Sequence, residues 1–173
     1  MWSDFKFQTS LGEMKSMASV VSEHEYTVLH FSRYIGCTIC QLDLLDYKDN
    51  YNDFQSKNTE VITVLQSNPE MVSKENASFP FIIACDPRGE LYQEFEVGIA
   101  KSTMGLLSLK TVKKAIKAKR AGLEHGEYEG QELQLPALFV FNRQKEIVYS
   151  KYAKDLGDLP SASEVLQIIE KNL

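Results

Sequence analysis

The sequence is poor in the residues that mark several special classes of protein. Its 173 residues include only three cysteines, nine glycines and five prolines, which excludes a disulfide framework, a collagen-like repeat and a low-complexity chain. No apolar run approaches the roughly 18–20 residues that a membrane span needs. The first residues lack the apolar stretch and small-residue cleavage site of a secretory signal. We therefore expect a cytoplasmic protein with no membrane partner.

An excess of positive charge is also missing. The chain carries 19 Lys and Arg against 24 Asp and Glu, a net charge of −5, so nucleic acid is not an expected partner. Apolar residues make up 43% and charged residues 25%, as in ordinary globular proteins. This length and composition predict a single domain over residues 1–173, with a core large enough to need no disulfide or metal.

An alternation of predicted strands and helices indicates the fold class. Three apolar runs, rich in β-branched and aromatic residues, predict strands buried on both faces: residues 26–32, 61–65 and 79–85. Between the first two, a period near 3.6 predicts one long helix from Cys37 to about Lys57. A hairpin at residues 137–152 precedes a last helix that opens on the capping box Ser161–Glu164. The prediction is an α/β fold with a mixed central sheet, helices on both faces, and a C-terminal β-hairpin plus helix.

A helical insertion at about residues 101–132 interrupts this alternation. Leu109, Val112 and Ile116 form an apolar stripe, which predicts a helix. Basic residues cluster there from Lys101 to Arg120, and four glutamates follow. Such a run is usually a solvated face, and docking of an acidic partner is the alternative.

The residues that indicate chemistry are Cys37 and Cys40, spaced C-x-x-C where a buried strand passes through Gly36 into a helix. The first turn of a helix has unpaired N–H groups and the positive end of the dipole, and both stabilise a thiolate. Only the thiolate attacks disulfides or peroxides. We therefore expect an exposed Cys37 as the nucleophile and a more buried Cys40 that closes a disulfide with it.

Other interpretations of the cysteines are weaker. Two unrelated core cysteines are improbable in this strand–glycine–helix context. A zinc site needs four ligands, and neither a second C-x-x-C nor a Cys/His pair is present, so we predict no metal and no other cofactor. Cys85 ends an apolar run and is expected to be a buried, inert side chain, with a resolving role as the alternative.

Several segments resemble the thioredoxin superfamily, and more narrowly its alkyl hydroperoxide reductase/thiol-specific antioxidant branch of peroxiredoxin-like proteins. They are, in order, Arg33-x-x-Gly36-Cys37-x-x-Cys40, Phe79-Pro80-Phe81 leading to Cys85–Tyr92, Leu135–Val140, and Gly157-Asp158-x-Pro160. The resemblance covers nearly the whole chain and implies a thioredoxin-like fold. It implies that Cys37 attacks and Cys40 resolves. It also implies a peroxide or disulfide-containing protein as substrate and an external dithiol such as a thioredoxin-like protein as reductant, and it allows a homodimer.

The resemblance also assigns supporting residues. Gly36 and Thr38 belong to the C-x-x-C motif, and Pro136 matches a cis-proline that faces it, so we expect a cis bond after Leu135. Two peroxiredoxin positions have changed. The Thr/Ser three residues before the nucleophile is Tyr34, whose hydroxyl is a candidate substitute, and the arginine of the late strand aligns with Pro136 itself.

Arg33 is the candidate for the missing positive charge, and a solvated strand-end residue is the alternative. With both family donors changed, we expect slow peroxide reduction and faster exchange with disulfides, since exchange needs neither donor. The predicted function is a thiol–disulfide oxidoreductase of peroxiredoxin-like type. The alternatives are a thiol peroxidase with an altered peroxide pocket and a non-catalytic redox sensor or binding module.

Overall fold

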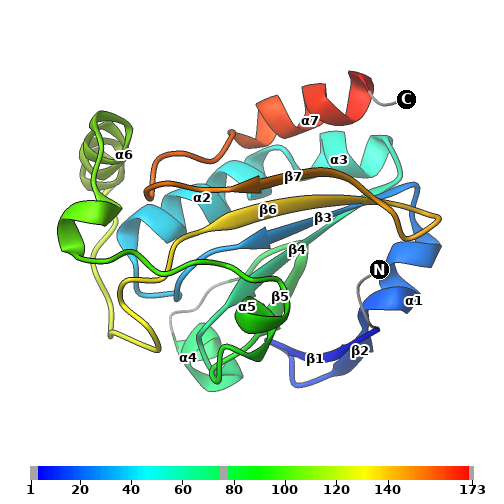
Figure 1. Ribbon diagram of the computed structural model, residues 1–173, viewed down its shortest axis with the longest axis horizontal. Helices are drawn as coiled ribbons and strands as arrows, with labels where there is room; N and C mark the ends of the chain where they lie inside the picture. Colours follow the sequence, from blue (N-terminus) through cyan, green and yellow to red (C-terminus); the bar gives the residue numbers. More distant parts are fainter. Residues whose placement is uncertain (1–3, 75–77, 172–173) are drawn as a thin grey trace.

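A seven-stranded mixed sheet forms the centre of the molecule in the computed structural model, which describes residues 4–74 and 78–171 (Figure 1). The strand order is β2-β1-β5-β4-β3-β6-β7. The strands are β1 Lys6–Thr9, β2 Met14–Ser16, β3 Tyr26–Phe31, β4 Thr59–Leu65, β5 Ile82–Cys85, β6 Ala137–Asn142 and β7 Ile147–Tyr152. β3 pairs parallel with β4 and antiparallel with β6, so the sheet is mixed as predicted.

The middle strands are buried on both faces, as their composition predicted. All six side chains of β3 are buried, and so are six of the seven in β4. Because β3 lies at the centre of this apolar layer, the position of its carboxyl end is fixed by neighbours on both sides. That end leads directly into the C-x-x-C segment.

Helices cover both faces of the sheet and confirm the predicted fold class (Figure 1). They are α1 Met17–Glu23, α2 Thr38–Asp49, α3 Tyr51–Ser56, α4 Pro69–Lys74, α5 Glu90–Glu94, α6 Leu109–Arg120 and α7 Ala162–Lys171. On one face, the core includes Leu44 and Tyr47 of α2, Phe54 of α3, Val72 of α4, and Val165 and Ile169 of α7. On the other, it includes Val20 and Val21 of α1 and Leu91 and Tyr92 of α5.

The predicted long helix from Cys37 to Lys57 is two helices, α2 and α3, which meet at Asn50. The Asn50 side-chain amide donates to the Asp46 carbonyl at 2.8 Å, and its backbone leaves the helical region with φ −100° and ψ 4°. Asparagine competes in this way with the helical hydrogen bonds of the main chain. The apolar spacing continues across the break, so the periodicity alone did not reveal it.

The C-terminal hairpin and helix are as predicted. β6 and β7 pair antiparallel around a tight turn in which Lys145 adopts φ 68°. At the start of α7, the Ser161 N–H donates to the Glu164 carboxylate, and the Glu164 N–H donates to the Ser161 hydroxyl. This reciprocal pair is the predicted capping box.

The predicted insertion contains a 3₁₀ turn, η1 (Thr103–Leu106), and the helix α6, and then a stretch with little regular structure up to β6. α6 lies at the rim of the molecule beside α2 (Figure 1). Its inner side is formed by the small residues Thr111 and Ala118, and Lys114 pairs with Asp43 of α2 at 2.6 Å. The stripe that predicted the helix faces outward, because the small side chains allow the closer approach to α2. No helix among the described residues is long and apolar enough to cross a membrane.

Candidate active site

Cys37 lies at the start of α2, where the sequence placed it. β3 ends at Phe31, and six residues later Cys37 is the N-cap residue of α2. Its sulfur accepts a hydrogen bond from the Cys40 backbone N–H at 3.4 Å, and its carbonyl accepts from the Gln41 N–H at 2.9 Å. The Cys37 sulfur therefore takes the position at which a side-chain oxygen usually caps a helix, and negative charge is favoured there.

The two thiols are unequal, as predicted. The Cys40 thiol donates to the Cys37 sulfur at 2.6 Å, and this hydrogen bond is the main cause that lowers the pKa of Cys37 to about 7. The positive charge of Arg33 contributes in the same direction, and burial opposes both. Burial raises the pKa of Cys40 well above its usual range. Near neutral pH a substantial share of Cys37 is therefore thiolate, whereas Cys40 holds its proton.

The expectation that Cys37 is exposed is wrong, since Cys37 and Cys40 are each only 3% exposed. A segment of residues 123–131, which we call the cover loop, lies over the strand–helix junction. The Gly126 N–H donates to the Gly36 carbonyl at 2.8 Å. A Cβ atom on Gly36 would lie 2.5 Å from the Glu127 carbonyl oxygen, so only glycine permits this close approach.

Arg33 lies beside Cys37 and is not the solvated strand-end residue of the alternative interpretation. It is 8% exposed, and its Nη1 lies 3.8 Å from the Cys37 sulfur. Its Nη2 donates to the Tyr34 hydroxyl oxygen at 3.5 Å, and its Cζ lies 5.0 Å from the centre of the Tyr34 ring. Its Nε has no hydrogen-bond partner among the described residues. A guanidinium with a free donor is therefore buried next to the thiolate.

Tyr34 is fully buried and bonds to a histidine of the cover loop. Its hydroxyl lies 3.2 Å from Nε2 of His125, whose Nδ1 lies 2.8 Å from the Gly126 carbonyl oxygen. Because a carbonyl only accepts, neutral His125 carries its proton on Nδ1 and accepts at Nε2 from the Tyr34 hydroxyl. Burial raises the pKa of Tyr34, which keeps that hydroxyl protonated. The Tyr34 proton thus points to His125, whereas the sequence considered it as a substitute donor at the cysteine.

The cover loop is held to the body of the protein by hydrogen bonds and ring contacts along its length. The Ser67 hydroxyl donates to the Glu129 carboxylate at 2.6 Å, and the Gln41 amide donates to the Glu124 carbonyl at 3.4 Å. Tyr128 packs its ring 4.4 Å from that of His125. Sequence reasoning missed the contact of this loop with Tyr34, because 91 positions separate Tyr34 from His125 and no spacing pattern links them.

Pro136 follows a trans peptide bond, so the predicted cis bond after Leu135 is wrong. The Leu135 N–H donates to the Gly98 carbonyl, and the Pro136 carbonyl accepts from the Ala153 N–H. These bonds hold an extended segment that enters β6 without a reversal, and an extended path suits the ordinary trans form. The first residue of β6, Ala137, pairs with Phe31, the last residue of β3. Pro136 therefore still lies at the end of the sheet where the chain leaves β3 and continues to Arg33.

The remaining predicted residues have simpler positions. Thr38 is the first residue of α2 and is half-buried. Cys85 is buried at the end of β5, and burial raises its pKa to about 12, which fits the inert thiol that the sequence predicted. Within residues 4–74 and 78–171, no three His, Cys, Asp or Glu side chains come together in a way that could hold a metal ion.

A mixed sheet with helices on both faces and a strand–C-x-x-C–helix junction defines a thioredoxin-like thiol redox protein. The model of the AhpC/TSA family matches residues 1–150, and the chain belongs to this family. It is a peroxiredoxin-like, thiol-dependent oxidoreductase. No curated protein sequence matches the chain.

Solved structures of peroxiredoxins share the fold at low sequence identity. Peroxidoxin BcpB from Mycobacterium tuberculosis has 12% identity and a TM-score of 0.67, with 98% of this chain and 94% of that one covered. The reduced 2-Cys peroxiredoxin of Plasmodium vivax has 10% identity and a TM-score of 0.70, covering 99% and 93%. A peroxiredoxin Q mutant from Xanthomonas campestris has 15% identity and a TM-score of 0.68, covering 98% and 92%.

Proposed function

We propose that this protein is a thiol peroxidase in which Cys37 attacks the peroxide. The Cys37 thiolate attacks one oxygen of R–O–O–H and becomes a sulfenic acid, while the other oxygen leaves and is protonated to an alcohol or water. The Cys40 thiol then attacks the sulfenic sulfur, which forms the Cys37–Cys40 disulfide and releases water. An external dithiol, such as a thioredoxin-like protein, reduces this disulfide and is itself oxidised.

The observation that carries the proposal is the buried Arg33 guanidinium beside the Cys37 sulfur, 3.8 Å from Nη1. Peroxide reduction builds negative charge on the leaving oxygen, and fixed donors in a site shielded from water stabilise that charge. In this chain Pro136 stands where the family's late-strand arginine aligns. Arg33, which follows the end of β3, supplies the positive charge instead. The partnerless Nε adds a further donor in the same buried place.

Two structural facts favour a peroxide over the disulfide substrate that the sequence favoured. The sequence favoured a disulfide because both family donors are changed, and disulfide exchange was expected to use an accessible Cys37 and backbone at the Pro136 turn to hold an extended partner. Cys37 is 3% exposed under the cover loop, and the bond before Pro136 is trans. A peroxide needs much less room than the disulfide of a folded protein, for which the cover loop must move away.

The identity of the partners follows from this chemistry. The oxidised C-x-x-C pair needs a dithiol of lower reduction potential, and the cytoplasm is kept reducing by such dithiols, so we propose action in that compartment. Catalytic turnover separates this proposal from a redox sensor. An enzyme consumes many equivalents of peroxide when a dithiol is supplied, and a sensor is oxidised once and changes its binding.

Substitution of Arg33 tests the proposal. We expect Arg33→Gln to lower the second-order rate constant with hydrogen peroxide by ~10²–10³, the typical cost of losing one fixed donor to the developing charge. Arg33→Lys keeps the charge without the planar guanidinium, so its rate constant should lie between those of wild type and Arg33→Gln. Stopped-flow rates are compared at a pH where Cys37 is ionised in each variant, as fixed by its alkylation profile. Equal rates for wild type and Arg33→Gln under that condition would contradict the proposal.

A further inference from the structure

The outer side of the insertion exposes an unusual number of large apolar side chains. Five of them, from η1 to the middle of α6, are between 47% and 83% exposed: Met104, Leu107, Leu109, Val112 and Ile116. Isolated exposed apolar residues are normal, but several that are close together in one segment, three of them on one face of α6, mark an interaction surface. We call these five side chains the apolar ridge.

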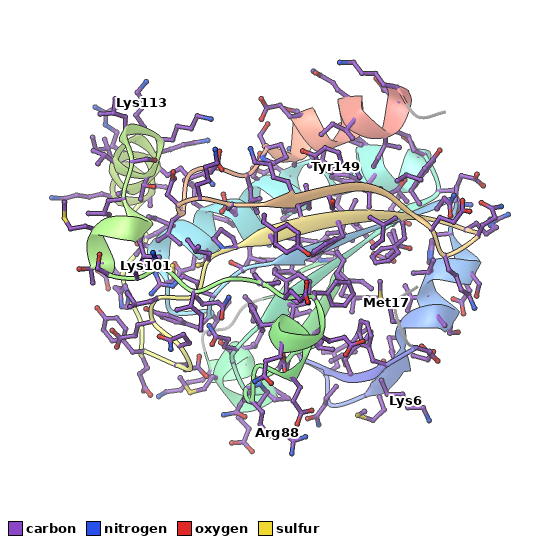
Figure 2. The ribbon with its side chains drawn as sticks, in the orientation of Figure 1. Lys6, Met17, Arg88, Lys101, Lys113 and Tyr149 are labelled. Atoms are coloured by element: carbon purple, nitrogen blue, oxygen red, sulfur yellow. The ribbon has the colours of Figure 1, made fainter. Side chains whose placement is uncertain are left out.

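Basic side chains border the apolar ridge. α6 contains six basic residues and no acidic one: Lys110, Lys113, Lys114, Lys117, Lys119 and Arg120. At about 100° per residue, Leu109, Val112 and Ile116 fall within a sector of about 60°, with Lys119 on one side and Lys113 on the other. Lys113 extends from the outer edge of the molecule in Figure 2. The outer face is thus an apolar stripe between two basic borders.

Nearby acidic groups neutralise only those basic side chains of α6 that lie on its inner side. Asp43 of α2 pairs with Lys114 and also lies near Lys117, while Asp158 and Glu164 lie near Lys110. Among the described residues, no ion pair within 4 Å involves Lys113, Lys119 or Arg120. The outward charge therefore remains unpaired.

We propose that η1 and α6 dock the protein on an anionic membrane surface, with the apolar ridge in the acyl region and the basic borders at the lipid headgroups. An amphipathic helix with a basic polar face binds membranes in this way without spanning them. This replaces the expectation from the sequence that no membrane is a partner, which addressed spans and secretion signals alone. The proposal does not depend on the proposed peroxidase activity.

The charge and shape of the surface favour a bilayer over other occupants. A second copy of the chain would bring the same basic face against itself in a symmetric contact, and like charges there are unfavourable. A helix at the rim of the molecule is a convex ridge, so an acidic protein would need a matching apolar groove (Figure 1). A fluid bilayer supplies negative charge and an apolar interior to a convex surface without a preformed groove.

The proposed surface adjoins the active site. Leu106 of η1 belongs to a small apolar cluster that packs against Ile39, which lies between the two cysteines. α6 itself rests on α2, the helix that begins at the C-x-x-C motif. Docking through the apolar ridge would therefore bring the first turn of α2 close to the lipid headgroups.

Vesicle sedimentation of the full chain tests the proposal. At about 0.1 M salt we expect binding to phosphatidylglycerol/phosphatidylcholine vesicles and much weaker binding to pure phosphatidylcholine. Each lysine near such a surface contributes about fivefold in affinity, so the double variant K113Q/K119Q should bind roughly 25-fold more weakly. The double variant L109Q/I116Q should also lose binding. The control K6Q/K15Q removes the same charge far from α6 (Lys6 and Lys113 lie at opposite ends of Figure 2) and should bind as wild type does.

Each other outcome contradicts membrane docking by η1 and α6. These are no binding of wild type to the anionic vesicles, equal binding to both lipid compositions, no effect of L109Q/I116Q, and equal losses in K113Q/K119Q and the control. Binding to soluble polyglutamate without binding to the vesicles would assign the surface to an acidic protein instead. Circular dichroism verifies that the variants are folded. The solution rate constant with hydrogen peroxide should be unchanged in K113Q/K119Q, whether or not the peroxidase proposal holds.

Discussion

At the scale of single residues, the reactivity of Cys37 is set within a short stretch of chain. Arg33 supplies positive charge, Cys40 supplies a thiol and a backbone N–H, and α2 begins there. These groups offset the burial that alone would raise the pKa of Cys37. The arrangement combines a dry site with an ionised sulfur, which a reaction that develops charge on a leaving oxygen needs.

The hydrogen bond from the Cys40 thiol stabilises the Cys37 thiolate, so its removal should change the pKa of Cys37. Cys40→Ala removes a donor that stabilises the Cys37 thiolate, so the pKa of Cys37 should rise above its wild-type value of about 7. The midpoint of the pH profile for iodoacetamide alkylation of Cys37, followed by mass spectrometry, should move upward. Cys85→Ala is the matched control, since Cys85 is absent from the groups that shift the pKa of Cys37, and its midpoint should stay near 7. A Cys40→Ala midpoint equal to that of wild type would show that the thiol donor is unimportant.

The contact between Cys37 and Cys40 predicts which disulfide forms. Mass spectrometry of protein treated with one equivalent of hydrogen peroxide should find Cys37 linked to Cys40 and Cys85 free, because the two sulfurs of the motif are already 2.6 Å apart. Burial keeps Cys85 protonated at neutral pH. A Cys37–Cys85 link would transfer the resolving role to Cys85.

Part of this chemistry could be predicted from the sequence. Gly36 and the C-x-x-C spacing placed Cys37 at a helix start with Cys40 one turn later, which predicted that Cys37 is the more acidic thiol. The main causes, the hydrogen bond from the Cys40 thiol for Cys37 and burial for Cys40, come from the folded structure. The burial of Arg33 could not be predicted, because a charged residue at a strand end is usually solvated. His125 reaches Tyr34 through tertiary structure alone.

At the scale of elements, the cover loop determines access to the sulfur. It has little regular structure, and its position depends on hydrogen bonds to residues such as Gly36 and Ser67 and on the stacked rings of Tyr128 and His125. Elements held mainly by polar contacts open more readily than core strands. We therefore expect the cover loop to move when the Cys37–Cys40 disulfide meets its reductant.

Gly36→Ala tests the packing of this loop. The added Cβ would lie 2.5 Å from the Glu127 carbonyl oxygen, which is backbone, so the loop must shift. We expect a loss of ~1–3 kcal/mol in the free energy of unfolding, measured by urea denaturation, together with faster alkylation of Cys37. Gly98→Ala meets nothing closer than Leu135 Cδ1 at 4.0 Å and should change stability by less than about 0.5 kcal/mol. Wild-type stability and alkylation in Gly36→Ala would mean that the loop does not cover the site in solution.

Periodicity predicted the existence of elements better than their surroundings. The stripe Leu109–Val112–Ile116 correctly predicted a helix, but the face that packs on α2 is the one with Thr111 and Ala118. A stripe shows that a helix is amphipathic without showing what it meets. The apolar spacing also continues across Asn50, although the helix ends there. The break comes from a local hydrogen bond of the Asn50 side chain, which does not change the apolar pattern.

At the scale of the whole molecule, the mixed sheet encloses a titratable group. His30 lies near the carboxyl end of β3, 1% exposed, with Nδ1 3.4 Å from the Thr63 hydroxyl and its ring 5.2 Å from that of Tyr47. Burial lowers its pKa from 6.5 to about 3. The folded protein therefore holds His30 neutral over a pH range in which the unfolded chain protonates it.

This difference predicts how stability depends on pH. The folded pKa is below the unfolded one, so the contribution of His30 is fully present above pH 6.5 and is lost as pH falls from 6.5 towards 3. The loss approaches about 1.4 kcal/mol per pH unit within that window. Urea denaturation at several pH values should give a flatter profile for His30→Gln than for wild type between pH 6 and 4. Parallel profiles would show that His30 is not held neutral in the fold.

The central claim is that the protein reduces peroxides by means of Arg33 and a buried Cys37, and relative rates with two oxidants test it most directly. Stopped-flow mixing of reduced wild-type protein with hydrogen peroxide, and separately with oxidised glutathione as a disulfide, measures the second-order rate constant of Cys37 oxidation by each. Arg33 activates the peroxide, and the cover loop restricts the larger disulfide, so we predict that peroxide reacts faster. If the disulfide reacts faster, the account is contradicted, and the function is the thiol–disulfide exchange that the sequence first indicated.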